Sequence, residues 1–494
     1  MPTTVTRRDN NGDIISEKPL RLNQSRDSGN DADTPAYLSI AYQKAFPHVE
    51  LCCDAYEGSS AWVIEEQVTD SNKAARYLPK ESQEQSEQYT NRILRSLFAN
   101  SFKAAVRGFA GLLSDFEVSD DAAIAEWLDD VDLQGSSLKA FLCDADEMVL
   151  RDGMCGILVD YPESPEIENA EQEQALGLRP YLVLIERKDI LNWRHSAAGM
   201  LEQVTVRRME TRPEGLFGEK EVTTYHVWMP GIKQVWEEVE NDGDVSVVLI
   251  NEMPITPLTV VPLVPYSVTA LTPFASMPPL LDLAKMNFHH YRLYSDYMEV
   301  MHKCNLPVPV RKGYMPAGTV DGAALPPVVI GPNTAIDVPA DGDFNFAEPS
   351  GAAIGATRQA LIDLEERMMQ ESLNFLGNTG MATATEVQLR SSQSRASLSL
   401  LAEQKESAVQ KIFAIWAEWI GVEEPGSIQV SRSLMQEKLE AAMVNILSQM
   451  QSLGQLPLQD LLDILQKGQV IPRTIDIEEI AQRVNPLQDE ALGL

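Results

Sequence analysis

The first third of the chain has the hydrophobic spacing of amphipathic helices. Tyr89, Ile93 and Leu97 recur at every fourth position, and the apolar stripe continues beyond them. Gly108 and Gly111 interrupt the far end of this stripe, so a helix break or a close backbone approach is expected there. The pattern further predicts a helix at 138–151 and, after a glycine turn, a strand at 156–161.

Between residues 179 and 266 the hydrophobic pattern changes to a period of two, which is typical of half-buried strands. Asn241-Asp-Gly-Asp244 has the composition of a tight hairpin turn between two of these strands. The chain is therefore predicted to be an α+β protein, mainly α. The antiparallel strands are expected at 181–185, 204–209, 223–228, 233–239 and 245–250.

A helix of uncommon composition is expected at 278–303, because its apolar residues are not confined to one stripe. A helix that is apolar on most of its faces must be buried on most of its faces. Neighbouring copies of the chain are therefore expected to supply part of its cover. The residues assigned to this packing are Phe288, Tyr291, Tyr294, Tyr297 and Met298.

Prolines exclude a helix from 306–351, which leaves short strands and turns. A helix is expected at 352–376, and it stops at the turn Gly377-Asn378-Thr379-Gly380. Thr383 and Glu386 then have the spacing of a capping box, which opens a long helix. The helices expected in the last part of the chain are 383–420, 433–453, 457–467 and 476–484.

The chain is strongly acidic: 40 Lys and Arg against 73 Asp and Glu give a formal net charge of −33. Proteins that grip DNA phosphates over a broad surface normally carry the opposite sign, so a conventional DNA-binding domain is not expected. Residues 115–178 contain eighteen acids and two bases. We interpret this segment as a solvated outer face, with a dedicated site for a cation or a basic partner as the alternative.

The sequence contains no phosphate-binding loop, dinucleotide fingerprint, zinc-protease motif or nucleophile elbow. His289 and His290 are adjacent on a helix and point about 100° apart, which suits a single metal ion poorly. The segment 341–345 starts like a calcium loop but lacks its glycine and its twelfth-position Glu. The run 143–147 is interpreted as an exposed acidic helix edge. We therefore expect no catalytic residue, no metal and no cofactor, and hence no enzyme.

Other features bear on the compartment. The five cysteines are odd in number and form no C-x-x-C pair, which favours a reducing compartment. No apolar run reaches about 18 residues, so no membrane span is expected. Residues 1–35 are rich in Asn, Asp, Arg and Ser and are predicted to form a flexible arm.

Several motifs occur in an order that resembles the portal proteins of tailed bacteriophages, in particular a branch long catalogued as a domain of unknown function. The first is Val149-Leu-Arg-Asp-Gly-Met-Cys-Gly-Ile-Leu-Val-Asp-Tyr-Pro162, followed by Arg179-Pro-Tyr181 and Ile190-Leu-Asn-Trp-Arg194. The 278–303 helix and the Pro/Gly insert come next, then Glu348-Pro-Ser-Gly351 and Thr383-Ala-Thr-Glu386. The resemblance covers about residues 77–483 and depends on the order and spacing of these motifs.

The resemblance implies a ring of about twelve copies with cyclic, heterologous contacts at one capsid vertex. Double-stranded DNA would pass through its axis without sequence specificity, driven by a separate terminase, and would be retained and later ejected. The implied regions are an N-terminal arm (1–35), a wing (36–276), a first stem helix (277–303), a clip (304–351), a second stem helix (352–376), a tunnel loop (377–382), a long wing helix with its connection (383–432) and a crown (433–494).

The resemblance also implies sites and partners. Gly377, Asn378, Thr379, Gly380 and Met381 would form the tunnel loop that lines the DNA channel, with a plain surface turn as the alternative. Arg311 and Lys312 would contact a partner at the clip, unless they are simply two solvated bases after a strand. The implied partners are the terminase large subunit, a head-to-tail adaptor and the major capsid protein, in a virion assembled in the bacterial cytoplasm.

The residues support the resemblance in their own right through charge. About twelve copies of −33 sum to roughly −400, a field that repels phosphates so that DNA slides through. Two other classes stay open: another head–tail adaptor or scaffold component of a virion, and an acidic soluble enzyme whose site is scattered along the chain.

Overall fold

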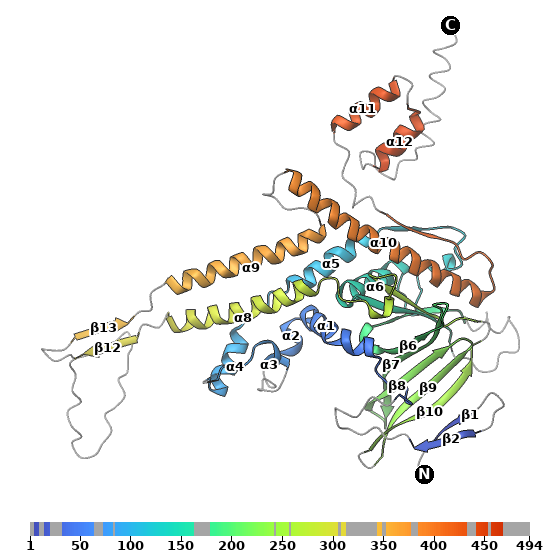
Figure 1. The fold of residues 1–494 in the computed structure, drawn as a ribbon, viewed down its shortest axis with the longest axis horizontal. Coiled ribbons are helices and arrows are strands. Elements are labelled where there is room, and N and C mark those ends of the chain that lie inside the picture. The colour runs from blue at the N-terminus through green and yellow to red at the C-terminus, as the bar shows by residue number, and fades with distance from the viewer. Residues whose placement is uncertain are drawn as a thin grey trace, which may run out of the picture. The chain divides into compact units, whose positions relative to one another are not determined.

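The computed structural model describes residues 4–8, 14–19, 32–63, 73–82, 84–162, 178–241, 244–255, 258–304, 308–312, 343–347, 352–376, 384–431, 441–452 and 456–467. The chain divides into two compact units. Unit 1 comprises Met1–Tyr56, Phe102–Ala284 and Gln370–Leu494, and unit 2 comprises Glu57–Ser101 and Lys285–Met369. The fold is α+β, as predicted, with runs of consecutive helices and runs of consecutive strands along the chain (Figure 1).

Unit 1 contains a five-stranded antiparallel sheet with the strand order β10-β9-β8-β7-β6. The hydrophobic alternation predicted four of these strands, which all extend further than the pattern indicated, but it did not predict the strand at 190–195. Asn241 and Asp244 pair directly at the predicted hairpin between the last two strands. The bounds are β6 Ile190–His195, β7 Leu201–Glu214, β8 Gly218–Met229, β9 Ile232–Asn241 and β10 Asp244–Pro254.

The core of unit 1 surrounds a smaller antiparallel sheet with the order β11-β4-β5. Its central strand β4, Met154–Asp160, is buried at every position. Helices α6 (Leu138–Asp152) and α10 (Ala384–Ile420) pack against this sheet. The flanking strands are β5 Tyr181–Ile185 and β11 Leu263–Ser267.

The remaining elements of unit 1 are short or peripheral. Helices α1 (Ile40–Glu57) and α5 (Ser101–Leu113) and the pair β3 (Phe116–Val118) with β14 (Ile428–Val430) complete its described core. Short 3-10 turns lie at Ala125–Trp127, Arg187–Asp189 and Pro273–Ala275. The predicted C-terminal helices are present as α11 (Ala441–Ser452) and α12 (Leu458–Lys467), whereas 476–484 lies outside the described residues.

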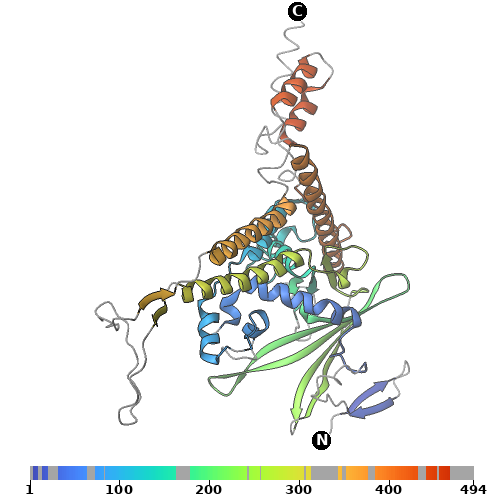
Figure 2. The ribbon, with the colours of Figure 1, turned by 60° about the vertical axis from the view of Figure 1, so that its left-hand side comes forward.

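Unit 2 is built on two long helices that run side by side in opposite directions, α8 and α9 (Figures 1 and 2). Their bounds are Leu281–Cys304 and Ala352–Leu376, which agree closely with the predicted stem helices. Between them, β12 (Val308–Lys312) pairs with β13 (Asp343–Ala347), so strands replace helix in the Pro-rich insert as expected. The smaller helices are α2 (Ser59–Trp62), α3 (Lys73–Tyr77) and α4 (Ser86–Arg95).

Two helical predictions were wrong. The stripe through Leu97 does not form one continuous helix, because α4 ends at Arg95 and Leu97 is 60 % exposed in the following segment. Gly108 and Gly111 do not break α5, which runs through both of them to Leu113. A Cβ added at either glycine would meet nothing within 4 Å, so neither position marks a close approach.

Part of the predicted N-terminal arm, 1–35, has secondary structure, and its flexibility stays a prediction. Strands β1 (Thr4–Arg8) and β2 (Ile14–Pro19) form an antiparallel hairpin. Among the described helices, none is both long enough and apolar enough to cross a membrane.

The end of α6 depends on a glycine. Gly153 has a φ of 87°, in the left-handed region, and its N–H donates to Val149 O at 2.8 Å. A Cβ at this position would lie 2.5 Å from Met277 O. Any other residue would therefore combine an unfavourable backbone conformation with a backbone clash.

We expect Gly153→Ala to lower the free energy of unfolding by more than about 2 kcal/mol, because strain and clash add. The matched control is Gly199→Ala, which has a similar φ of 83° but open space around it. Urea denaturation should show a loss of about 1 kcal/mol for the control. Equal losses in the two variants would contradict the role assigned to the Met277 contact.

Candidate functional site

The first candidate site is the helix pair α8–α9, and one face of α8 is covered by its own chain. The Tyr77 ring stacks on Phe288 with centroids 3.9 Å apart. The ring centroid of Phe98 lies 5.3 Å from that of Phe288 and 5.7 Å from that of Tyr291. Phe288 is 3 % exposed and Tyr291 is fully buried. These two residues belong to the core of unit 2, so their assignment to packing between subunits was wrong.

Hydrogen bonds fix the same face of α8. Asn287 Nδ2 donates to Ala99 O at 2.8 Å, and Arg292 Nε donates to Tyr77 O at 2.7 Å. Residues 287, 288, 291 and 292 follow the three- and four-residue spacing that places side chains on one helix face. The side chains therefore hold residues 77–99 against α8.

A buried arginine organises the segment that provides this cover. Arg92 donates to both carboxylate oxygens of Glu84 at 2.8 Å, and its Nη2 also donates to Pro79 O at 3.0 Å. The two side chains are only 5 % and 9 % exposed. The hydrogen bonds to Glu84 raise the pKa of Arg92 above its usual value, so the ion pair stays charged.

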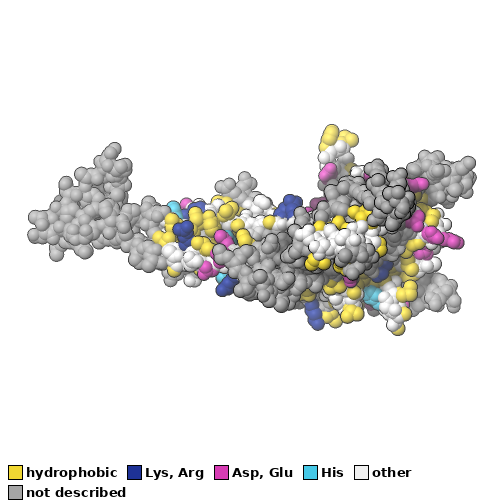
Figure 3. All heavy atoms as spheres, turned by 90° about the horizontal axis from the view of Figure 1, so that it is seen from above, with side chains coloured by type: hydrophobic (Ala, Val, Ile, Leu, Met, Phe, Trp, Pro, Cys, Tyr) yellow, Lys and Arg dark blue, Asp and Glu magenta, His cyan; other side chains and the backbone are white. Residues whose placement is uncertain are grey.

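Helix α9 covers α8 only partly. Leu361 and Met368 are buried, and Glu365 Oε1 lies 3.0 Å from His290 Nε2 of α8. Ile362 and Met369 of α9 are 36 % and 63 % exposed. On the face drawn in Figure 3, hydrophobic side chains are visible among charged ones. On α8, the residues that are only half-buried include Tyr294, Tyr297 and Met298, and their contact with other subunits stays a prediction.

The candidate partner contact at the clip lies in a strand. Arg311 and Lys312 are the last residues of β12 and stand opposite Phe344 and Asp343 of β13 in the register. They do not follow the strand, as the alternative interpretation had assumed. The rest of the predicted clip, 313–342, lies outside the described residues.

The candidate tunnel loop lies outside the described residues, since Gly377, Asn378, Thr379, Gly380 and Met381 all belong to the undescribed segment 377–383. Thr383 of the capping box belongs to the same segment. The described structure fixes the ends of this connection: α9 ends at Leu376 and α10 begins at Ala384. Seven residues therefore separate the two described helices, whereas the sequence predicted six, 377–382.

Helix α10 is attached to the core of unit 1 through a buried ion pair. Lys405 Nζ donates to Asp146 Oδ2 at 2.6 Å and to Leu113 O at 2.8 Å. Tyr266 donates its hydroxyl proton to Asp146 Oδ1 at 2.7 Å. Lys405 and Asp146 are both fully buried. The interpretation of 143–147 as an exposed acidic edge was therefore wrong for Asp146.

Burial raises the pKa of Asp146 to about 6, even though the Lys405 ammonium and the hydrogen bonds from Lys405 and Tyr266 act to lower it. Further contacts follow along α10. Glu406 accepts from Val430 N at 2.8 Å, Glu418 accepts from Thr259 N at 3.0 Å, and Trp419 Nε1 donates to Val159 O at 3.3 Å. The C-terminal half of α10 is thus fixed to both β4 and β14.

The acidic segment 115–178 is divided between interior and surface. Asp146, Asp152 and Asp160 are buried, and five of its acids lie outside the described residues. The interpretation as a solvated outer face therefore needs correction for these three. The stem helices contribute little charge, because α8 has three acids and three bases and α9 has four acids and two bases.

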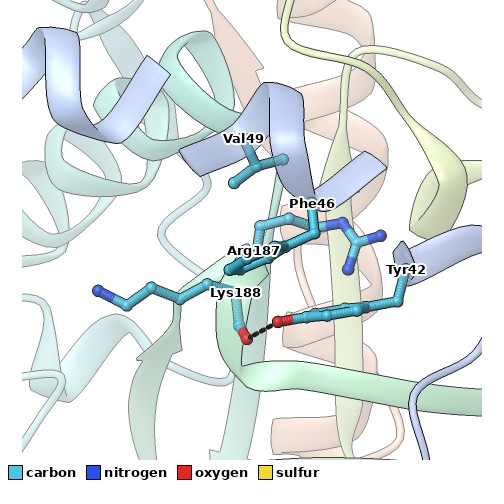
Figure 4. Close-up of a pocket in the computed structure, with 5 residues that line it drawn as sticks. All are labelled: Tyr42, Phe46, Val49, Arg187 and Lys188. Carbon is cyan, nitrogen blue, oxygen red and sulfur yellow. Dashed lines mark hydrogen bonds between the residues drawn. The ribbon is translucent and has the colours of Figure 1, made fainter. Parts of the chain in front are cut away.

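A small hollow in unit 1 is lined by Tyr42, Phe46, Val49, Arg187 and Lys188 (Figure 4). Tyr42 donates to Lys188 O at 2.8 Å, and the Arg187 guanidinium lies 5.6 Å from the Tyr42 ring. Burial lowers the pKa of Arg187 to about 10. The hollow has an empty volume of about 130 Å³, well below the volume of typical ligand pockets, so it offers no room for a substrate.

Metal chemistry finds no support in the described part of the chain. Within these ranges, no group of three or more His, Cys, Asp or Glu side chains is placed to hold a metal ion. His290 is engaged with Glu365, and His289 is exposed.

Comparison with known proteins gives one family match. Residues 279–420 match a family described as "Domain of unknown function (DUF4055)". The match spans α8, β12, β13 and α9 and ends with α10. No protein of curated function matches the chain.

Among solved structures, the chain is similar to a component of the "Virion of native gene transfer agent (GTA) particle", with 11 % identity and a TM-score of 0.39 over 72 % of this chain and 85 % of that one. It is also similar to a component of the "Neck of empty GTA particle computed with C6 symmetry", with 12 % identity and a TM-score of 0.39 over 74 % and 90 %. A third similarity is to the "Neck of native GTA particle computed with C12 symmetry", with 10 % identity and a TM-score of 0.38 over 73 % and 87 %. TM-scores below 0.5 do not establish a shared fold.

We expect Lys405→Met to lower the free energy of unfolding by about 3–5 kcal/mol at pH 8, because it leaves Asp146 charged, buried and unpaired. A folded-state pKa above the unfolded value means that protonation favours the folded chain. Removing the Lys405 ammonium raises the pKa of Asp146 further, so the variant is protonated at a pH where the wild-type pair is still charged, and the loss should shrink as pH falls from 8 toward 6. Urea denaturation followed by tryptophan fluorescence measures both effects.

The control is Lys411→Met, an exposed lysine on the same helix, which should change the free energy of unfolding by less than about 0.5 kcal/mol. The variant Asp146→Asn/Lys405→Met should lose the pH dependence. A Lys405→Met loss that is small, or that grows as pH falls, would contradict the assigned pairing.

Proposed function

We propose that this chain is the portal protein of a tailed-phage capsid, a ring through which double-stranded DNA is packaged, retained and ejected. The observation that carries the proposal is the order of elements along the chain. Two long helices, α8 and α9, are separated by the strand pair β12–β13, and a seven-residue connection then leads into α10, a helix of 37 residues. The order of motifs that resembles portal proteins covers these same elements. The family match of 279–420 covers them as well.

The incomplete cover of the helix pair supports the proposed ring. The chain buries Phe288 and Tyr291 itself but leaves Tyr294, Tyr297 and Met298 half-buried, and Met369 of α9 mostly exposed. In a ring with heterologous contacts, one face of each subunit packs against a different face of the next. The helix pair offers such surfaces on both of its members.

The proposed passage of DNA requires that the channel attracts the DNA phosphates only weakly. The stem helices together carry a net charge of −2, and the whole chain carries −33. Phosphates would therefore find no basic surface on α8 and α9 to bind strongly. In this proposal the chain has no catalytic role, and a separate terminase supplies the work of packaging.

The connection 377–382 would be the tunnel loop that contacts the duplex, and Arg311 and Lys312 would contact the terminase or the adaptor at the clip. A different adaptor or scaffold protein of the head–tail region is the second candidate. Such a protein would share the partly covered helix pair α8–α9 but would not need the loop to retain DNA.

Charges placed on the half-buried face of α8 test the ring. We expect Tyr297→Lys/Met298→Lys to prevent ring assembly, because two ammonium groups would be desolvated at each subunit contact. The particle mass should fall to that of a single chain, while the circular dichroism spectrum stays unchanged. His289→Lys, at an exposed position of the same helix, is the control and should leave the rings intact.

A change in the mass of the control equal to that of the double variant would show that any charge on α8 disrupts the particle. Rings that persist in the Tyr297→Lys/Met298→Lys variant would contradict the packing face assigned here.

Deletion of residues 377–382 tests the role in DNA transport. We expect the deleted chain to form rings of normal subunit number, whereas the DNA retained per phage particle should fall by roughly tenfold or more, since the contact that holds the duplex is lost. A chain in which the segment is replaced by Gly and Ser of equal length separates loop chemistry from loop length.

Particles that package and retain DNA normally after both changes would favour the scaffold alternative. Failure of both chains to form rings would mean that the segment belongs to the structural core.

A further inference from the structure

The five-stranded sheet of unit 1 has two edges, and the chain covers one of them with known contacts. At β6, Ser39 N donates to Leu191 O at 3.1 Å. The Asn192 side-chain amide donates to Tyr37 O at 2.8 Å and to Pro35 O at 3.3 Å. Residues 35–39 therefore occupy the β6 edge.

The opposite edge, β10, has a different character. No described strand pairs with its outer side. Unpaired edges offer a row of backbone donors and acceptors, and proteins normally protect them with charges, prolines or bulges. The second half of β10 is protected in this way, by the irregular register between Leu249 and Asn251, by Glu252 and by Pro254.

The first half of β10 has none of these protections. Its sequence from Val245 to Leu249 is Val-Ser-Val-Val-Leu, without charge or proline, and it ends where the register becomes irregular at Ile250. Leu249 is 39 % exposed and Ile250 is 56 % exposed. A regular, apolar and uncharged strand edge of this kind pairs readily with any strand that reaches it.

The N-terminal hairpin is the described segment that reaches it. Strand β1 lies against β10 within unit 1, although β1 and β2 form a separate sheet of two strands. An isolated two-stranded hairpin is marginally stable in water and needs a surface to pack on. Twelve residues, 20–31, connect the hairpin to the described chain that leads into the β6 cover, and they span up to about 40 Å when extended.

We propose that the free edge of β10 is a strand-addition site and that its occupant is the β1–β2 hairpin of the same chain. Backbone hydrogen bonds from the hairpin would extend the sheet and stop the edges of two copies from pairing with each other. The two ends of the N-terminal region then have related roles, since 35–39 covers one edge of the sheet and 4–19 covers the other. This inference does not depend on the proposed portal function.

Hydrogen exchange tests the cover. In the full chain, backbone amides of 245–250 should be protected, and deletion of residues 1–19 should accelerate their exchange by roughly tenfold or more. A peptide from the central strand β8 is the internal control and should be unchanged. Equal exchange of 245–250 in the two chains would overturn the proposal.

Self-association provides a second readout. The chain lacking 1–19 should form larger species with rising concentration than the full chain forms. Val248→Lys in the shortened chain should reverse this, because a charge on the bare half of the edge blocks strand pairing. Persistent association of the Val248→Lys variant would count against the edge as the site of contact.

Disulfide formation identifies which copy supplies the hairpin. A chain carrying both Val5→Cys and Val248→Cys should form a cross-link within one chain, seen as a monomer of altered mobility on a non-reducing gel. Each single variant controls for the native cysteines. A cross-linked dimer from two co-expressed single variants would overturn the assignment to the same chain, whether or not the protein forms a ring.

Discussion

Helix α8 must bury apolar side chains on more faces than its own chain covers. One face is covered completely, since the Tyr77 ring stacks on Phe288 and Tyr291 is fully buried. A second face meets α9 where Glu365 Oε1 lies 3.0 Å from His290 Nε2. The aromatic side chains beyond Phe288 and Tyr291 remain half-buried along a helix of 24 residues. Burial of this remaining surface is worth roughly 25 cal/mol for each Å², which favours association of copies through it.

A second constraint acts on α10. Lys405 and Asp146 are fully buried, so the helix cannot shift along its axis without separating two charges in a medium of low dielectric. The hydrogen bonds of Glu406, Glu418 and Trp419 lie within four turns of the same helix. The connection between α9 and α10 is therefore followed by a helix whose far half is fixed to a rigid core.

Much of the fold was predictable because its elements are long and strongly periodic. The bounds of α6, α8, α9 and α10 follow from helical spacing and from the glycines and prolines beside them. The two-residue period predicted four strands of the five-stranded sheet and missed β6. One kind of error concerns which part of the molecule buries an apolar side chain. Periodicity indicates that Phe288 must be buried, but it does not distinguish Tyr77 of the same chain from a neighbouring subunit.

The candidate sites were less predictable for physical reasons that particular residues illustrate. Asp146 lies in a run of acids that resembles a solvated edge, and only the fold brings Lys405, 259 positions later in the chain, to its carboxylate. Gly108 and Gly111 resemble a helix break but lie in open positions where α5 simply continues. The N-terminal hairpin was missed because short polar strands have weak local signals.

In the proposed ring, copies of this chain bury the remaining apolar face of α8 against one another around an axial channel. The most direct measurement is electron-microscopic projection imaging of the purified full chain, combined with its native mass. We expect closed rings of about twelve copies with an axial opening wide enough for a DNA duplex. A single, well-folded chain that remains a monomer at high concentration would contradict the account.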